Sequence, residues 1–160
     1  MKNLRKFYID GCWQDPISPK TMPVLNPATE MQEGIVALGN NVDVNKAVAA
    51  AKKAFKSYSK TTKQERLDLL GRLKTITQRR FEDLAQAMRT EMGAPITMAR
   101  DAQADAAVGH LNGFIAALED FNESETLSNG DEITHEPIGV CGLITPWNWP
   151  INQIALKVVP

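Results

Sequence analysis

The sequence predicts an α/β fold, and three features of its 160 residues lead to that prediction. Short stretches rich in β-branched and aromatic residues occur near the amino terminus, and such stretches favour strands. In the middle of the chain, apolar residues recur every three or four positions, which is typical of helices with one buried face. Near the end, the apolar run Ile138–Ile144 contains two spaced glycines and predicts a strand that is buried on both faces.

The amino-terminal region predicts short strands joined by turns. Residues 7–13 indicate a strand and a turn, with Asp10-Gly11 as the turn signal. Residues 18–23 are rich in proline and predict a loop. Residues 24–29 predict a short strand that runs into a turn, and Gly34–Gly39 predicts a second strand.

Helices are expected in the central part of the chain. The first covers Val42–Tyr58 with Asn41 as its N-cap, and the capping-box pattern Thr62-Lys63-Gln64-Glu65 starts the second. A third helix covers roughly Phe81–Met92, with Gly93 as its carboxyl-terminal cap. The inward residues expected for these helices are Val44, Ala47, Val48, Ala51, Phe55, Leu67, Leu70, Leu73, Ile76, Leu84, Ala87 and Met88.

A fourth and longer helix is expected from Pro95 to about Phe121. Small residues along one of its faces predict close packing against neighbouring helices. The expected inner stripe is Ala99, Gln103, Ala106, His110, Phe114, Ala117 and Phe121.

A proline-rich turn follows the predicted buried strand. Pro146 and Pro150 each lack a backbone donor and fix φ, so the strand cannot continue through this segment. Residues 150–156 then favour a helix with proline in its first turn. Because ligands of open parallel α/β sheets bind at such strand-to-helix turns, we expect a ligand site here.

The sequence of residues 136–150 is Glu-Pro-Ile-Gly-Val-Cys-Gly-Leu-Ile-Thr-Pro-Trp-Asn-Trp-Pro. It closely resembles the aldehyde dehydrogenase motif Glu-Pro-x-Gly-Val-x-Gly-x-Ile-x-Pro-Trp-Asn-Phe-Pro, with Trp149 in place of the more frequent Phe. Weaker motifs of the family, Asp-Gly-x-Trp, Asn-Pro-Ala-Thr and Gly-x-Val-Ala, occur upstream in the expected order. The resemblance covers residues 7–160 and implies the amino-terminal part of a Rossmann-like dinucleotide-binding domain with a helical layer and a β-arm.

The resemblance also implies how the chain is organised. Residues 1–125 would form the amino-terminal part of an NAD(P)-binding domain, and residues 126–137 an oligomerisation β-arm. Residues 138–160 would form the first cofactor-side strand, the turn and the start of a helix. In the family the arm pairs with a neighbouring subunit, so a homo-oligomer, a dimer or a tetramer, is implied. The residues alone show only a turn signal at Ser128–Asp131 and a short exposed strand at Glu132–Glu136.

Asn148 is the candidate catalytic residue. A side-chain amide held rigidly between prolines and tryptophans is a preorganised donor that can stabilise an oxyanion. The alternative is an asparagine that only satisfies the backbone of the turn. The resemblance assigns Asn148 to the oxygen of a tetrahedral thiohemiacetal. It also implies that Ile144, Thr145, Pro146 and Trp147 contact the ribose and phosphates of NAD or NADP, although these residues could also simply end a buried strand, with Trp147 in the core.

The cysteines and histidines indicate no further site. Cys141 lies within the predicted apolar strand, so we expect a buried and inert thiol, and its position does not match the family's catalytic cysteine. Cys12 is expected to be structural, and a disulfide between the two is not expected. His110 is expected to be a hydrogen-bonded packing residue, and His135 to be solvated or interfacial. Two isolated histidines and two distant cysteines lack the spacing of a metal site.

Charge and composition exclude several classes of function. The chain has 18 Lys plus Arg against 19 Asp plus Glu and no basic patch, so we expect no nucleic-acid partner. No apolar stretch is long enough to span a bilayer, and no signal-peptide segment follows the basic start. We therefore expect a cytoplasmic protein without a membrane partner.

The resemblance implies an NAD(P)-dependent enzyme that oxidises an aldehyde to a carboxylic acid through cysteine attack, hydride transfer and thioester hydrolysis. The family's catalytic cysteine and general-base glutamate have no counterpart in this sequence, which also contains no Gly-x-Gly-x-x-Gly. We therefore expect a fragment that is inactive alone, exposes apolar surface and tends to aggregate. The alternatives are a non-catalytic module that associates with full-length subunits through the arm, and a helical adaptor without a ligand.

Overall fold

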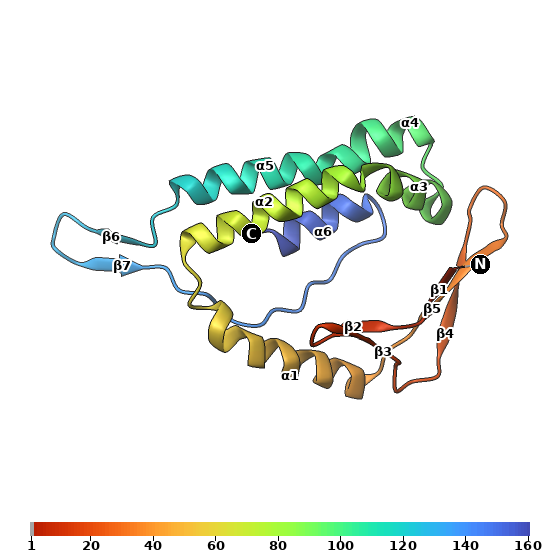
Figure 1. The fold of residues 1–160 in the computed structure, drawn as a ribbon, viewed down its shortest axis with the longest axis horizontal. Helices are drawn as coiled ribbons and strands as arrows, with labels where there is room; N and C mark the ends of the chain where they lie inside the picture. The colour runs from red at the N-terminus through yellow and green to blue at the C-terminus, as the bar shows by residue number, and fades with distance from the viewer. Residues whose placement is uncertain (1) are drawn as a thin grey trace.

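The computed structural model describes residues 2–160 and shows a mixed α/β arrangement (Figure 1). One group of helices lies side by side, and α1 with the amino-terminal strands lies apart from it. The helices are α1 (Asn41–Tyr58), α2 (Lys63–Arg79), α3 (Phe81–Met92), α4 (Ile96–Met98), the π-helical turn η1 (Ala99–Ala104), α5 (Asp105–Asp120) and α6 (Pro150–Val158). The strands are β1 (Lys2–Leu4), β2 (Phe7–Ile9), β3 (Cys12–Gln14), β4 (Thr21–Leu25), β5 (Gln32–Ala37), β6 (Ser124–Thr126) and β7 (Glu132–Thr134).

The amino-terminal strands form two small sheets. β2 and β3 pair as an antiparallel hairpin whose turn residues Asp10 and Gly11 have φ of 50° and 80°, which confirms the predicted strand and turn. β1 pairs parallel to β5, and β5 pairs antiparallel to β4. The predicted loop is wrong over residues 21–23, because β4 begins at Thr21. β4 tolerates Pro23 because it is an edge strand, where the missing N–H can face away from the sheet.

The N-cap of α1 is Asn40 rather than the predicted Asn41. Asn40 Oδ1 accepts hydrogen bonds from the backbone N–H of Val42 at 2.8 Å and of Asp43 at 3.2 Å. Asp43 in turn accepts from the N–H of Asn40 at 3.0 Å and from the N–H of Ile17 at 2.8 Å. These bonds, the one from Ile17 first, lower the pKa of the Asp43 carboxyl and tie α1 to the chain that precedes β4.

The predicted stripes of α1 and α2 are only partly buried. On α1, Val44 is 59% exposed and Val48 is 36% exposed, and on α2, Ile76 is 46% exposed. The apolar residues of α1 stay exposed because α1 packs mainly against the short strand β2. It stands away from the helical group (Figure 1). Leu70 and Leu73 of α2 do pack inward, as predicted.

The start of α2 and the end of α3 form as predicted. Thr62 Oγ1 accepts from the N–H of Glu65 at 3.2 Å, and Glu65 Oε2 accepts from the N–H of Thr62 at 2.8 Å, which completes the capping box of α2. α3 ends at Gly93, which is left-handed with φ of 78° and donates its N–H to the carbonyl of Arg89.

The expected long helix forms as α4, η1 and α5 without a break between residues 96 and 120. Ala99 and Gln103 are buried as predicted, but the buried positions then shift to Ala104, Ala107 and Leu111. A π-helical turn holds more residues than an α-helical turn, so the inward face moves by one residue along the chain. The predicted inner residues beyond Gln103 are therefore half-buried or, for Ala117 and Phe121, exposed.

α6 begins at Pro150, which confirms the predicted helix with proline in its first turn. Ile151 packs against the first hydrophobic cluster, which α3, the residues after it and η1 build from Ala85, Met88, Ala94, Ala99 and Ala104. Ala155 and Val159 join Leu111 of α5 in a second cluster that Leu70, Leu73 and Phe114 cover. The small side chains at these contacts bring α6 close to η1 and α5.

The predicted buried strand at Ile138–Ile144 is not formed within the described residues. This segment runs as an extended connection from β7 to α6 (Figure 1), with Ile138 93% exposed and Ile144 88% exposed. A strand buried on both faces needs hydrogen-bonding neighbours and covering layers, and none of the three sheets of residues 2–160 lies beside it. The α/β prediction is confirmed, whereas these residues form no Rossmann-like sheet.

β6 and β7 form an antiparallel hairpin that projects from the helical group (Figure 1). All residues of both strands are exposed. Its base is fastened by a hydrogen bond from the N–H of His135 to the carbonyl of Glu123 at 2.9 Å, and by an ion pair between Glu123 and Arg66 of α2. The ring of His135 also lies against Phe121, with centroids 5.1 Å apart.

Candidate functional site

The candidate site is the turn between the extended segment and α6. Trp149, the residue before the helix, is left-handed with φ of 54° and ψ of 57°. A bulky residue in this region of backbone space costs about 1–3 kcal/mol, and such strained positions cluster at functional sites. Pro150 contributes to this geometry because a proline disfavours the right-handed helical conformation in the residue before it. The turn is therefore sharp and conformationally restricted.

Asn148 is exposed at this turn, and none of the hydrogen bonds found among residues 2–160 uses its side chain. Its neighbours Trp149 and Pro150 are half-buried and anchor the turn on the helical group. The amide is thus presented to solvent by a restricted backbone. That arrangement suits a donor for a ligand better than a residue that satisfies its own turn.

The four residues predicted to contact a dinucleotide lie directly before Asn148. Ile144 is 88% exposed, Thr145 and Pro146 are exposed, and Trp147 is 81% exposed. The alternative that Trp147 belongs to the core is therefore wrong for the described chain. The segment has no secondary structure, and its side chains are exposed in the described chain. These properties fit one wall of a dinucleotide site.

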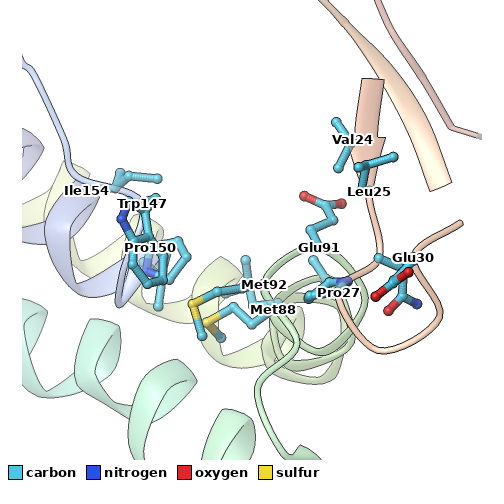
Figure 2. Close-up of a pocket in the computed structure, with 14 residues that line it drawn as sticks. Val24, Leu25, Pro27, Glu30, Met88, Glu91, Met92, Trp147, Pro150 and Ile154 are labelled. Atoms are coloured by element: carbon cyan, nitrogen blue, oxygen red, sulfur yellow. The ribbon is translucent and has the colours of Figure 1, made fainter. Parts of the chain in front are cut away.

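A cavity of about 1000 Å³ lies between the turn, α3 and the end of β4 (Figure 2). Trp147, Pro150 and Ile154 stand on one side of it, and Met88 and Met92 of α3 lie across from them. The remaining wall comes from Val24, Leu25, Asn26, Pro27, Glu30, Leu84, Ala87, Glu91 and Ile151. Among the predicted site residues, only Trp147 lines this cavity, so Asn148 and residues 144–146 face other surroundings.

Two polar contacts near the site were not found from the sequence. His110 Nε2 of α5 lies 2.6 Å from Asn152 Oδ1 of α6, so His110 is hydrogen-bonded as predicted, but its partner was not foreseen. Arg100 of η1 forms a two-point contact with Glu82 of α3, at 2.8 Å and 2.7 Å. These bonds from Arg100, with one from Gln86, lower the pKa of Glu82 to about 2. Helical spacing gives no signal for either pair, because each joins separate elements.

The two cysteines are the remaining candidate residues. Cys12 and Cys141 are both free. Both are also exposed, so the predicted burial of Cys141 is wrong, for the same reason that the strand around it is not formed. Among the described residues, no group of three or more His, Cys, Asp or Glu side chains is placed to hold a metal ion.

Comparison with known proteins decides the family. Residues 13–160, nearly the whole chain, match the model of the aldehyde dehydrogenase family. The chain belongs to this family. The motif around Asn148 therefore lies in a sequence of the aldehyde dehydrogenase family.

Individual relatives agree with this assignment. A 3-succinoylsemialdehyde-pyridine dehydrogenase from a Pseudomonas species is 44% identical over 161 residues, which cover 100% of this chain and 34% of that protein. The crystal structure of an aldehyde dehydrogenase from Bartonella henselae superposes with a TM-score of 0.97 at 43% identity, over 99% of this chain and 34% of that one. A mutant of aldehyde dehydrogenase C from Pseudomonas syringae, in complex with NAD⁺ and octanal, superposes with a TM-score of 0.93 at 44% identity, over 97% of this chain and 32% of that one. The chain thus spans about a third of the length of the relatives that it matches.

Proposed function

We propose that this chain supplies the cofactor-side, amino-terminal part of an NAD(P)-dependent aldehyde dehydrogenase, which oxidises an aldehyde to a carboxylic acid. The observation that carries the proposal is the exposed amide of Asn148, in a turn restricted by Pro146, the left-handed Trp149 and Pro150. On this proposal, Ile138–Ile144 becomes the first strand of a Rossmann-like sheet once the rest of the family's polypeptide is present. The complete enzyme is a cytoplasmic homo-oligomer.

Asn148 would act on the oxygen of the aldehyde. When a thiolate adds to the carbonyl carbon, negative charge develops on that oxygen, and the Asn148 side-chain N–H donates a hydrogen bond to it. Because the turn is already restricted, this donor needs little reorganisation during the reaction. The reaction also needs the thiolate and a base that activates water. Asn148 supplies neither, so the chain is inactive on its own.

Ile144, Thr145, Pro146 and Trp147 would hold the dinucleotide through backbone groups and apolar contact. NAD⁺ or NADP⁺, when bound, accepts the hydride from the aldehyde carbon. The proposal of NAD⁺ is supported by two related structures that contain it, the Pseudomonas syringae protein and an aldehyde dehydrogenase from Mycobacterium tuberculosis that is 28% identical. The exposed Trp147 ring would exclude water from one side of the cofactor.

Two assays test the proposal. The purified chain should show no aldehyde-dependent reduction of NAD⁺ or NADP⁺. A chimera that joins these 160 residues to the remaining two thirds of the 3-succinoylsemialdehyde-pyridine dehydrogenase should show it. In the chimera, Asn148→Ala should lower kcat about 10²–10³-fold, as the loss of one oxyanion donor does. Asn45→Ala, on the exposed face of α1, is the matched control and should leave kcat unchanged. An equal kcat for both variants would refute the role of Asn148.

A second candidate function is a non-catalytic module that associates with full-length subunits through the β6–β7 hairpin. It is favoured by the projection of the hairpin and the exposure of all its strand residues. Co-purification of the chain with a full-length relative should then depend on apolar contact at Ile133, which is 37% exposed. Ile133→Asp should abolish it, whereas co-purification that persists in Ile133→Asp would argue against the hairpin as the contact.

A further inference from the structure

The contact between His110 and Asn152 joins α6, the helix that follows the site, to α5. His110 lies on α5 and Asn152 is the third residue of α6, four residues after Asn148. The His110 Nε2 and Asn152 Oδ1 atoms are 2.6 Å apart, and both residues are half-buried. Because an amide oxygen only accepts hydrogen bonds, this contact is a hydrogen bond in the His110 tautomer that has its hydrogen on Nε2.

The other contacts of α6 with the preceding helices are apolar. Ile151, Ala155 and Val159 make apolar contacts, and these are not directional. The segment before the turn is exposed and belongs to no sheet of the described chain, so no strand pairing holds α6 from its amino-terminal side. The bond to His110 is the directional contact recorded between α6 and the preceding helices.

The position of α6 determines the position of the turn that precedes it. The N–H of Gln153 donates to the carbonyl of Trp149 at 3.1 Å, so Trp149 belongs to the first hydrogen-bonded turn of the helix. Pro150 fixes the backbone between them. A shift or rotation of α6 therefore moves Trp149, and with it the attached Asn148, as one unit.

We propose that His110 is a positioning residue for Asn148: its hydrogen bond to Asn152 sets the register of α6 on α5 and so the direction of the Asn148 amide. This inference rests on the proposed function of Asn148. His110 itself contacts neither substrate nor cofactor. Because misplacement of a reacting group by about 1 Å can cost about 10²-fold in rate, a contact this far from the chemistry can matter for kcat.

The first test uses the 160-residue chain and measures hydrogen exchange of the hydrogen-bonded amides of residues 153–156 by mass spectrometry. His110→Phe keeps an aromatic ring and removes the donor, whereas His110→Gln keeps an N–H donor. His110→Phe should raise exchange at these amides about fivefold, and Asn152→Leu should do the same, as the loss of a typical net hydrogen-bond contribution predicts. The double variant should be no worse than either single one, because both remove the same bond. His110→Gln should restore slow exchange.

The second test uses the chimera described above. His110→Phe should lower kcat at least about fivefold with KM unchanged, and His110→Gln should recover most of the loss. A residue needed only for folding would instead lower the amount of folded enzyme, and leave kcat per active site unchanged.

The outcomes separate the two proposals. An unchanged kcat in Asn148→Ala would overturn the proposed function and the positioning role together. A lowered kcat in Asn148→Ala with an unchanged kcat in His110→Phe would overturn the positioning role alone. Wild-type exchange at residues 153–156 in His110→Phe would overturn it without any use of the chimera.

Discussion

Gly93 is a position where one added methyl group should be strongly destabilising. It ends α3 with φ of 78°, and a Cβ built there would lie 2.5 Å from Cγ of Pro27. Pro27 belongs to the turn after β4 that lines the cavity beside the site (Figure 2). The absence of a side chain at Gly93 is what lets this turn approach the end of α3.

Two effects lower the free energy of unfolding of the Gly93→Ala variant. The left-handed conformation costs a residue with a Cβ about 1–2 kcal/mol. The overlap with a proline ring, which cannot rotate away, adds about 1–3 kcal/mol, as overpacking generally does. We therefore expect the free energy of unfolding to fall by about 3 kcal/mol, measured by urea titration with far-ultraviolet circular dichroism at low protein concentration.

The same substitution elsewhere in the chain is the control. Gly113 lies inside α5, and an added Cβ there would have no neighbour within 4 Å. Gly113→Ala should therefore stabilise the chain by about 0.5–1 kcal/mol, because alanine is the better helix former. Pro27→Ala combined with Gly93→Ala should remove the steric overlap. The double variant should then show only the destabilisation that comes from the left-handed backbone. Equal effects of Gly93→Ala and Gly113→Ala would refute this reasoning.

Three further predictions concern other parts of the molecule. Thr62→Ala removes the N-cap acceptor of α2 and should lower the free energy of unfolding by about 1 kcal/mol in the same titration; no change would contradict the capping box. Hydrogen bonds from Arg100 lower the folded-state pKa of Glu82 from 4.5 to about 2, so the stability that this carboxylate contributes is fully present above about pH 4.5 and is lost as the pH falls toward 2. Glu82→Gln should flatten the pH dependence of stability in that window, and a profile identical to wild type would count against the pair. Ile138→Lys with Ile144→Lys, at positions 93% and 88% exposed, should reduce light scattering by the chain in solution, and unchanged scattering would mean that another surface drives association.

Local interactions explain which parts of the fold could be predicted from the sequence. The Asp10-Gly11 turn, the Thr62 capping box and the Gly93 cap each depend on residues within a few positions of one another, and all three form. Pro150 at the start of α6 belongs to the same class. The predicted N-cap of α1 lies one residue too late, because Asn40 and Asn41 are chemically identical, and it is Asn40 that forms a capping box with Asp43.

The errors come from contacts that are distant in sequence. The π-helical turn shifts the inward face of the long helix by one residue, and helical periodicity alone cannot reveal it. The apolar pattern of Ile138–Ile144 predicts a buried strand, but a buried strand requires pairing neighbours, and the segment belongs to none of the sheets of residues 2–160. The motif identifies Asn148 and its neighbours as candidates from adjacent residues alone, whereas the bond between His110 and Asn152 depends on how two helices pack.

The exposed segment between the hairpin and α6 also affects the risk of misassembly while the polypeptide is being synthesised. Residues 138–145 are uncharged, apolar and extended, which are the properties of segments that pair with the wrong strand in a neighbouring molecule. Pro137 and Pro146 bound this stretch on both sides, and a proline cannot donate to a growing ladder. These two prolines limit the number of residues over which a strand of another molecule can pair with the nascent chain. The proline that shapes the turn before Asn148 thus also serves as a gatekeeper against misassembly.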